Sequence, residues 1–301
     1  MRCRTIPYSL FPIPSLSVSV MLSRIFSAAT ALNLTVGITR HPSAKSVIVC
    51  AMGYPLLPPA GGEFETASAV RSFDYHEVLR KKLETLAESL PPCRYEIRVD
   101  DSNLPERNLA IAAGVGYRCK NGCIAAPPFG SACVIGEILT DLDLPFSRPL
   151  RESCGSCDLC AKACPAGAVG DPQKKICVSA LTQASHIPDE LKPLIDKNLY
   201  GCDICLRVCP KNKVVDAPDA GFYDFPLSFL ITVTKKDFEE RVKPTPIGYL
   251  GISRLRRNAI IIAANTNRVD LIDAIAAAPA DSPRVADAVK YALKKLSEIR
   301  Q

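Results

Sequence analysis

The first 140 residues mix two spacings of apolar positions, one typical of strands and one typical of helices. Short apolar or alternating runs predict four β-strands, at Leu34–Thr39, Ser46–Cys50, Tyr95–Val99 and Cys133–Leu139. Apolar residues at helical spacing predict three helices, from Met21, from about Asp74 to Leu90, and from Leu104 to Ala113. This part of the chain therefore predicts an α+β fold.

The texture of the chain changes twice after that region. Residues 153–213 consist of cysteine pairs, Cys-Pro turns and short apolar runs. After about Asp216 the chain carries three short helical patterns separated by turns, at Arg254–Asn265, Val269–Ala277 and Pro283–Ile299. We therefore expect three domains, covering residues 21–150, 151–215 and 216–301.

The N-terminal segment does not have the pattern of a membrane or secretory segment. No apolar run of the chain reaches the roughly 18–20 residues that span a bilayer. Met1–Val20 opens with arginines, but Pro7, Pro12 and Pro14 interrupt the apolar stretch that a signal peptide requires. We favour a start at Met21, where a clean amphipathic segment begins, and we expect no membrane association.

Composition points to metal chemistry in a reducing compartment. The 301 residues include fourteen cysteines and only three histidines. A chain of this length and 48% hydrophobic content buries a core without disulfides, so the thiols are candidate metal ligands and a cytoplasmic location follows.

The net charge of +6 lies entirely in the C-terminal part of the chain. From Arg241 onwards there are eleven basic and five acidic residues, and the rest of the chain is neutral. Basic helices are typical of nucleic-acid binding, although a solvated basic face without a partner has the same composition. The cluster of Arg254, Arg256 and Arg257 at a predicted helix start favours the nucleic-acid interpretation.

The most specific signal is the run Cys154-x2-Cys157-x2-Cys160-x3-Cys164-Pro165. Bacterial ferredoxins use this spacing to bind [4Fe–4S] clusters, with the fourth cysteine ligating the other cluster of a pair. A second motif, Cys202-x2-Cys205-x3-Cys209-Pro210, lacks its first cysteine because Leu199 stands there, and Cys177 can fill that place.

Eight cysteines then suffice for two cubes. The predicted ligands of the first cluster are Cys154, Cys157, Cys160 and Cys209, and those of the second are Cys164, Cys177, Cys202 and Cys205. Zinc, which also binds four thiolates, is the alternative, but the triple Cys-x2-Cys run is poor zinc spacing. The remaining cysteines show no ligand pattern, although Cys119-x3-Cys123 could bind a metal; they are Cys3, Cys50, Cys93, Cys119, Cys123 and Cys133.

A series of further motifs resembles the epoxyqueuosine reductase family, the cobalamin-dependent iron–sulfur enzymes that complete queuosine in tRNA. In chain order these motifs are Asp74-Tyr75-His76-Glu77-Val78-Leu79-Arg80, Val99-Asp100, Glu106-Arg107, Gly114-Val115-Gly116-Tyr117, Lys120-Asn121, Phe129-Gly130-Ser131, Gly136-Glu137-Ile138-Leu139-Thr140-Asp141, Tyr200-Gly201-Cys202-Asp203 and Leu255-Arg256-Arg257-Asn258. The chain departs from the family between the first two predicted strands, which only Arg40 to Lys45 join.

The resemblance implies a fold, an activity and cofactors. The fold is an N-terminal α/β corrinoid-binding domain, a ferredoxin-like domain with two [4Fe–4S] clusters and a small HEAT-like helical domain. The activity is an oxidoreductase reaction that reduces the epoxide of epoxyqueuosine to an alkene. The partners are tRNA, held by the basic C-terminal domain, and an unidentified low-potential electron donor, and we expect a monomer.

The resemblance also assigns individual residues. The alkoxide left by the opened epoxide needs a proton, and the family's acidic residue falls on Asp100; Asp101 is the neighbouring candidate, expected to cap the following turn. Tyr75 and His76 are implied cofactor contacts, or else a core contact and a surface histidine. Lys120 and Asn121 either hold a polar group of the corrinoid or are ordinary loop residues.

Two other functions remain open from sequence. The chain could be a corrinoid and iron–sulfur reductase of another substrate, similar to reductive dehalogenases. It could also be a non-catalytic electron-transfer protein with two clusters.

Overall fold

The computed structural model describes residues 4–5, 17–71, 74–170, 176–212 and 225–300, which form two compact units. The first unit comprises residues 1–55, 75–157 and 209–216, and the second comprises residues 56–74, 158–208 and 217–301. The positions of the two units relative to each other are not determined. The division into three domains at residues 150 and 215 stays a prediction.

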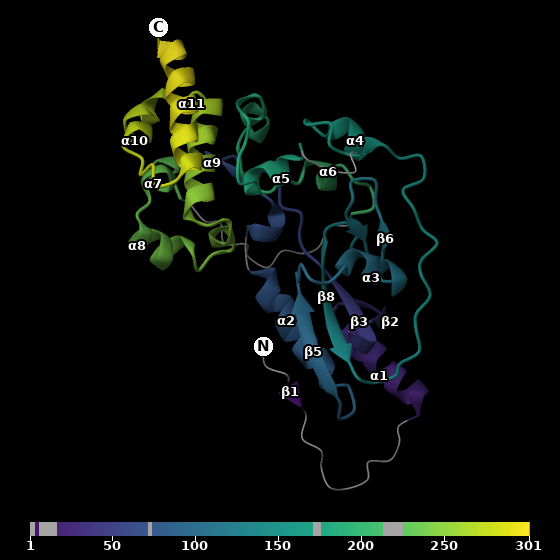
Figure 1. Cartoon of the computed structure of the whole chain (residues 1–301). Helices are drawn as coiled ribbons and strands as arrows, with labels where there is room; N and C mark the ends of the chain where they lie inside the picture. The colour runs from purple at the N-terminus through teal and green to yellow at the C-terminus, as the bar shows by residue number, and fades with distance from the viewer. Residues whose placement is uncertain (1–3, 6–16, 72–73, 171–175, 213–224, 301) are drawn as a thin grey trace. The chain divides into compact units, whose positions relative to one another are not determined.

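A five-stranded antiparallel sheet forms the centre of the first unit (Figure 1). Its order is β1 (Arg4–Thr5), β5 (Arg94–Val99), β8 (Cys133–Thr140), β3 (Ala44–Gly53) and β2 (Thr35–His41). The four predicted strands are all present, and the mixed helix and strand content is confirmed. The short connection between the first two predicted strands is a tight hairpin, since His41 pairs with Ala44.

Helices cover both faces of this sheet. On one face, α1 (Val18–Ala31) and α2 (Tyr75–Ala87) bury Ile25, Leu79 and Leu83 against the strands. On the other face, α3 (Glu106–Ala112) packs Leu109 and Ala110 against residues of β3 and β8. The three predicted helices are therefore confirmed; α1 begins before Met21, and Pro7, Pro12 and Pro14 lie outside the described residues.

Gly136 in β8 allows α2 to approach the sheet closely. A Cβ at this position would lie 2.9 Å from Leu83 Cδ1 and 3.0 Å from Leu79 Cδ2. The hairpin of β6 (Tyr117–Arg118) and β7 (Ile124–Ala125) completes the unit beside α3. At the end of β5, Val99 pairs with Gly136, and Asp100 follows directly.

The second unit is built mainly from helices around a core of its own. The C-terminal helices are α7 (Leu227–Thr232), α8 (Lys235–Asp237), α9 (Ile252–Asn265), α10 (Ile272–Ala276) and α11 (Pro283–Arg300). The three predicted helical patterns are confirmed, with Val269–Leu271 forming a 3-10 turn before α10. Helix α9 is the centre of this core, because every residue from Leu255 to Ala264 is buried.

Shorter elements of the second unit position several cysteines. Helices α4 (Leu159–Ala163), α5 (Val178–Gln183) and α6 (Ile204–Arg207) lie in the cysteine-rich block, where β4 (Glu65–Thr66) pairs in parallel with β9 (Asn198–Tyr200). Three further 3-10 helices are described at Ser68–Val70, Asp189–Ile195 and Pro246–Leu250, and a short π-helix at Phe238–Val242. Among the described residues, no helix is long and apolar enough to cross a membrane.

Candidate functional site

Asp100 stands at the point where β5 ends and the chain turns towards α3. Its φ angle is +52°, in the left-handed region that aspartate tolerates better than most residues. Tyr75 OH donates a hydrogen bond to Asp100 Oδ2 at 2.9 Å, and His76 Nε2 lies 3.3 Å from the same oxygen. The two rings at the start of α2 stack, with centroids 4.0 Å apart. The structure therefore brings three predicted site residues together.

These contacts favour the ionised form of Asp100. The hydrogen bond from His76, and after it the hydrogen bond from Tyr75, hold the pKa of the Asp100 carboxyl below its ordinary value. The nearby positive charge of Arg107 acts in the same direction. Asp100 must therefore receive a proton before it can donate one.

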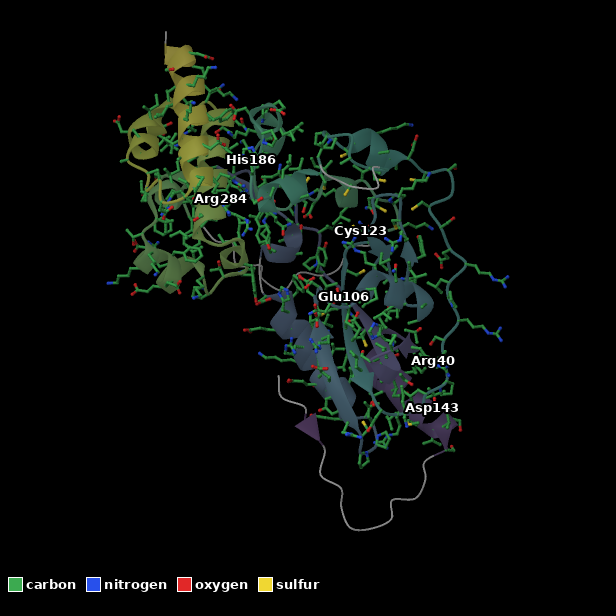
Figure 2. The ribbon with its side chains drawn as sticks, viewed as in Figure 1. Arg40, Glu106, Cys123, Asp143, His186 and Arg284 are labelled. Carbon is green, nitrogen blue, oxygen red and sulfur yellow. The ribbon has the colours of Figure 1, made fainter. Side chains whose placement is uncertain are left out.

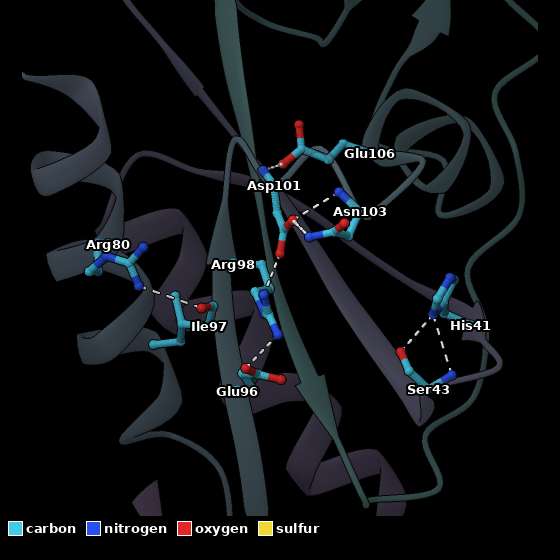
Figure 3. A network of polar contacts seen from close by, with 9 residues as sticks. All are labelled: His41, Ser43, Arg80, Glu96, Ile97, Arg98, Asp101, Asn103 and Glu106. Atoms are coloured by element: carbon cyan, nitrogen blue, oxygen red, sulfur yellow. Dashed lines mark hydrogen bonds and ion pairs between the residues drawn. The ribbon is translucent and has the colours of Figure 1, made fainter. Parts of the chain in front are cut away.

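Asp101 holds the turn that follows, as the sequence predicts for it. Its Oδ1 accepts hydrogen bonds at 2.9 Å from the backbone N–H and the side-chain amide of Asn103, and its second oxygen pairs with Arg98 (Figure 3). Its own backbone N–H donates to Glu106 Oε1 at 2.9 Å. This network makes Asp101 a structural neighbour of the site.

A pocket of about 170 Å³ opens beside Asp100 within the first unit. Its lining includes Tyr54, Tyr75, Asp100, Glu106, Cys123 and Ser131. Glu106 and Cys123 reach it from α3 and from the β6–β7 hairpin (Figure 2). A larger hollow of about 720 Å³ lies at the β2–β3 hairpin end of the sheet and contains none of the predicted catalytic or cofactor residues.

Two acidic residues near this pocket, Glu106 and Glu137, have raised pKa values that the sequence did not lead us to expect. Burial raises the pKa of the Glu106 carboxyl to about 7, and the charges of Asp100 and Asp101 add to this effect. Burial also raises the pKa of Glu137 to about 8, with the charge of Glu106 as the next cause. A glutamate inside the apolar run of β8 was the signal in the sequence that could have found the second of them.

Four thiols of the predicted second cluster belong to the second unit. Cys164 ends α4, Cys177 precedes α5, and both pack with Cys202 around Ala166 and Ala168. The backbone N–H of Ala168 donates to Cys164 Sγ at 3.3 Å. Cys205 lies in α6, which packs against α4.

This environment fits an iron–sulfur cube. Burial raises the pKa of the Cys202 thiol, and the charges of Asp203, Cys177 and Cys164 contribute. As thiolates these side chains would repel one another unless metal ions bound them. A [4Fe–4S] cluster supplies such ions and takes four thiolate ligands. The assignment of Cys202 to the second cluster is consistent with this environment and stays a prediction.

The predicted first cluster draws three of its ligands from the first unit. These are Cys154, Cys157 and Cys209, whereas Cys160 lies on α4 in the second unit. Cys154 packs beside the buried Cys119, and burial followed by the charge of Cys154 raises the pKa of the Cys119 thiol.

Single-ion geometry is absent from the described residues, which hold no group of three or more Cys, His, Asp or Glu side chains placed around one metal ion. A cube separates its thiolates by its own edges, so this finding does not test the eight-cysteine assignment. Cys50 and Cys93 are buried, as expected for packing residues, Cys133 lines the pocket, and Cys3 lies outside the described residues.

Lys120 and Asn121 occupy the turn between β6 and β7. Lys120 Nζ donates to the carbonyl oxygen of Cys157 at 2.8 Å. Asn121 is 4% exposed, and its Oδ1 accepts the backbone N–H of Cys123 at 3.0 Å. Both side chains therefore hold the hairpin and the first cysteines of the cluster run, and their contact with a corrinoid stays a prediction.

The expectation that Arg254, Arg256 and Arg257 together contact nucleic acid is wrong for two of them. Arg256 and Arg257 are each 1% exposed. Arg256 donates to the Val233 and Pro279 carbonyls and pairs with Asp281. Arg257 donates to the carbonyls of Thr182 and Ala184. Their charges satisfy buried carbonyl oxygens and are not available to phosphates.

Two protein-family models match the chain. Residues 39–101 match the model described as "Epoxyqueuosine reductase QueG, DUF1730", and residues 153–212 match the "4Fe-4S double cluster binding domain". The first range includes Asp100, and the second includes all eight predicted cluster cysteines. The chain is thus similar to each model in the region where sequence placed the corresponding chemistry.

Whole proteins match over most of the chain. An epoxyqueuosine reductase of Bacillus cereus is 34% identical over 267 residues, covering 81% of this chain and 70% of that protein. A crystal structure of selenomethionine-labelled epoxyqueuosine reductase matches with a TM-score of 0.83 at 25% identity, over 93% of this chain and 91% of the other. A structure of epoxyqueuosine reductase with an epoxyqueuosine-modified tRNA-Tyr stem loop matches with a TM-score of 0.78 at 25% identity, over 93% and 91%.

Proposed function

The chain belongs to the epoxyqueuosine reductase family, and we propose that it reduces the epoxide of epoxyqueuosine in tRNA to the alkene of queuosine. The observation that carries this function is the similarity to the Bacillus cereus enzyme over 81% of the chain. The chain is accordingly an iron–sulfur oxidoreductase, and tRNA is its substrate.

The reaction consumes two electrons and two protons and releases water. When bound, the two [4Fe–4S] clusters supply the electrons one at a time. This chain's eight cysteines hold them in two sets, Cys154, Cys157, Cys160 and Cys209 for one cluster and Cys164, Cys177, Cys202 and Cys205 for the other. In the second unit, Cys164, Cys177 and Cys202 pack together in one cluster, which supports the second set.

Asp100 donates the proton to the oxygen of the opening C–O bond. An alkoxide is a poor leaving group, so protonation as the bond breaks lowers the barrier. Asp100 lines the pocket, and Tyr75 and His76 orient its carboxyl through their hydrogen bonds. The pocket of about 170 Å³ suits a ring of the size of the epoxycyclopentane group.

Cobalamin is proposed as a further cofactor on the family resemblance. Ligand pockets of drug-sized molecules measure about 300–1,000 Å³, and Asp100 lines two hollows of about 550 Å³ each as well as the pocket of about 170 Å³. The size of these hollows is therefore compatible with a bound group beside Asp100, and Tyr75, His76, Lys120 and Asn121, the proposed contacts, all make contacts within the protein. We derive no step through cobalamin.

The C-terminal part of the second unit is proposed to bind tRNA through exposed lysines. Lys290 and Lys294 lie one turn apart on α11 and are both exposed, unlike the buried Arg256 and Arg257. Cytoplasmic tRNA and reduced thiols support a cytoplasmic site of action. We propose that the chain acts there as a monomer with an unidentified low-potential electron donor.

Anaerobic reconstitution followed by turnover tests the function. We expect about eight iron atoms per chain, from two cubes, and conversion of epoxyqueuosine to queuosine in tRNA. Asp100→Asn should abolish conversion and keep the iron, whereas the exposed Asp143→Asn should keep both conversion and iron. Undiminished conversion by Asp100→Asn would remove the proton-donor role.

A further inference from the structure

Glu106 places a second carboxyl group next to Asp100. It begins α3, lines the same pocket as Asp100, and accepts the backbone N–H of Asp101 at Oε1. This hydrogen bond holds its side chain against the turn that carries Asp100 (Figure 3). Glu106 therefore lines the pocket and at the same time contacts the turn that carries Asp100.

Glu137 lies behind this pocket in the sheet. Its side chain is 0% exposed, and neither carboxylate oxygen accepts a hydrogen bond from an N–H or hydroxyl group; a hydrogen bond between the Glu137 and Glu106 carboxyls helps to raise the pKa of Glu137. It shares a face of β8 with Ile135 and Leu139, which pack in the core beneath α3. An ionised carboxylate without water or partner is strongly disfavoured, so Glu137 holds its proton.

The cation across from Glu137 on the neighbouring strand does not neutralise it. Arg98 is its cross-strand neighbour on β5, but the Arg98 guanidinium bonds Glu96 and Asp101 (Figure 3). The charge of Glu106 is the strongest like-charge influence on the pKa of Glu137. The titratable or charged groups around the two glutamates are Tyr54, Tyr75, His76, Asp100, Asp101, Arg98, Arg107, Cys50, Cys123 and Cys133.

We propose that Glu106 and Glu137 form a buried proton store that protonates Asp100 during each turnover. Glu137 touches no reacting atom and acts through Glu106, so it is a positioning residue. This proposal rests on the proposed function, because it supplies the proton that Asp100 gives to the substrate. It also accounts for the resting state, in which Asp100 is the ionised partner of His76 and Tyr75.

The proton balance involves no electrons. The O–H bond of the Glu106 carboxylic acid breaks and an O–H bond forms on the ionised Asp100; the O–H bond of Asp100 then breaks and one forms on the oxygen of the opened epoxide. The O–H bond of Glu137 then breaks and one forms on Glu106. The transfer is uphill in the resting site and completes because the alkoxide is the stronger base. Solvent protons reload the pair through Glu106.

The test is Glu137→Gln, which keeps the volume and the neutral charge but removes the exchangeable proton. In steady-state turnover of epoxyqueuosine tRNA, we expect the alkaline limb of kcat to move down by about one pH unit, hence about tenfold slower turnover on that limb. A single turnover started at pH 6 should keep the rate of the unmodified chain. An unchanged pH profile of kcat would overturn the proton return.

Infrared titration checks the store without relying on turnover. The unmodified chain should show carboxylic acid absorption that disappears between about pH 6 and 9, and Glu137→Gln should lose the part that persists to the highest pH while keeping the part from Glu106. Absence of this absorption from the unmodified chain, or its full retention in Glu137→Gln, would overturn the store. If the unmodified chain turns nothing over, the proposed function and the proton return both fail, and the infrared band still decides the store.

Two further variants complete the design. Glu96→Gln is the matched control, since Glu96 bonds Arg98 in the same network but does not line the pocket, and it should keep the normal profile. Glu106→Gln, whose side chain lies only half-buried, carries the same test if Glu137→Gln does not fold. A shift of equal size in Glu96→Gln would overturn the proposal.

Discussion

Replacing Glu137 by Gln should change how the stability of the protein depends on pH. In the folded protein the pKa of Glu137 is about 8, raised by burial and then by the charge of Glu106, against an ordinary value of 4.5. The unfolded chain therefore releases this proton near pH 4.5, while the folded chain keeps it until about pH 8. Between these two values the folded state binds more protons, so its stability falls as pH rises.

The size of the effect follows from the shift. One pKa unit corresponds to about 1.4 kcal/mol. The raised pKa of Glu137 therefore lowers the free energy of unfolding by about 4 kcal/mol at pH 8, and has almost no effect on it at or below about pH 4. Sharing of the proton with Glu106 makes this an upper value. The glutamine side chain of the variant has no proton to release, so the variant should approach the stability of the unmodified chain near pH 5 and exceed it by about 2–4 kcal/mol near pH 8.

The assay is anaerobic urea unfolding of the cluster-loaded protein at pH 5, 6, 7 and 8. Comparing the free energies of unfolding of the variant and the unmodified chain at each pH cancels contributions of the clusters that both share. Glu96→Gln, in the same polar network, should keep the pH dependence of the unmodified chain. A difference between Glu137→Gln and the unmodified chain that is constant from pH 5 to 8 would refute the buried, protonated state.

Three further outcomes are expected. Arg257→Met should destabilise the second unit by about 3–5 kcal/mol in urea unfolding, because buried carbonyls lose a charged donor. The control Lys290→Met, at an exposed position, should change the free energy of unfolding by less than about 0.5 kcal/mol. Equal effects of the two variants would contradict the structural role of Arg257. Replacing Lys290 and Lys294 together by Ala should lower the salt dependence of tRNA binding by about 1–2 in log–log slope, and an unchanged slope would remove α11 from the interface. Exposure to air should bleach the protein and inactivate it, and activity that persists after full iron loss, measured by iron assay, would contradict cluster-dependent reduction.

Most of the fold was predictable because local pattern decides it. The strands and helices around Asp100 follow from the period of their apolar residues, and spacing alone identified the cysteines that the double-cluster model covers. Asp101 was predictable as a cap because an Asx turn needs only its next few residues. These features depend on contacts over short distances in the chain.

The features that sequence missed depend on distant contacts. Arg257 is charged, and charged residues are rarely buried, yet the carbonyls that accept its hydrogen bonds lie more than seventy residues earlier in the chain. The state of Glu137 depends on Glu106 and on an Arg98 that bonds other carboxylates. Nothing in the sequence reveals which acceptors surround a charge once the elements pack.

The most direct measurement is mass spectrometry of nucleosides from epoxyqueuosine-containing tRNA after incubation with the anaerobic, iron-loaded chain and a low-potential reductant. We predict that epoxyqueuosine loses one oxygen atom and becomes queuosine, and that Asp100→Asn leaves it unchanged while retaining iron. Unconverted epoxyqueuosine with the iron-loaded, cobalamin-supplemented chain would contradict the proposed function.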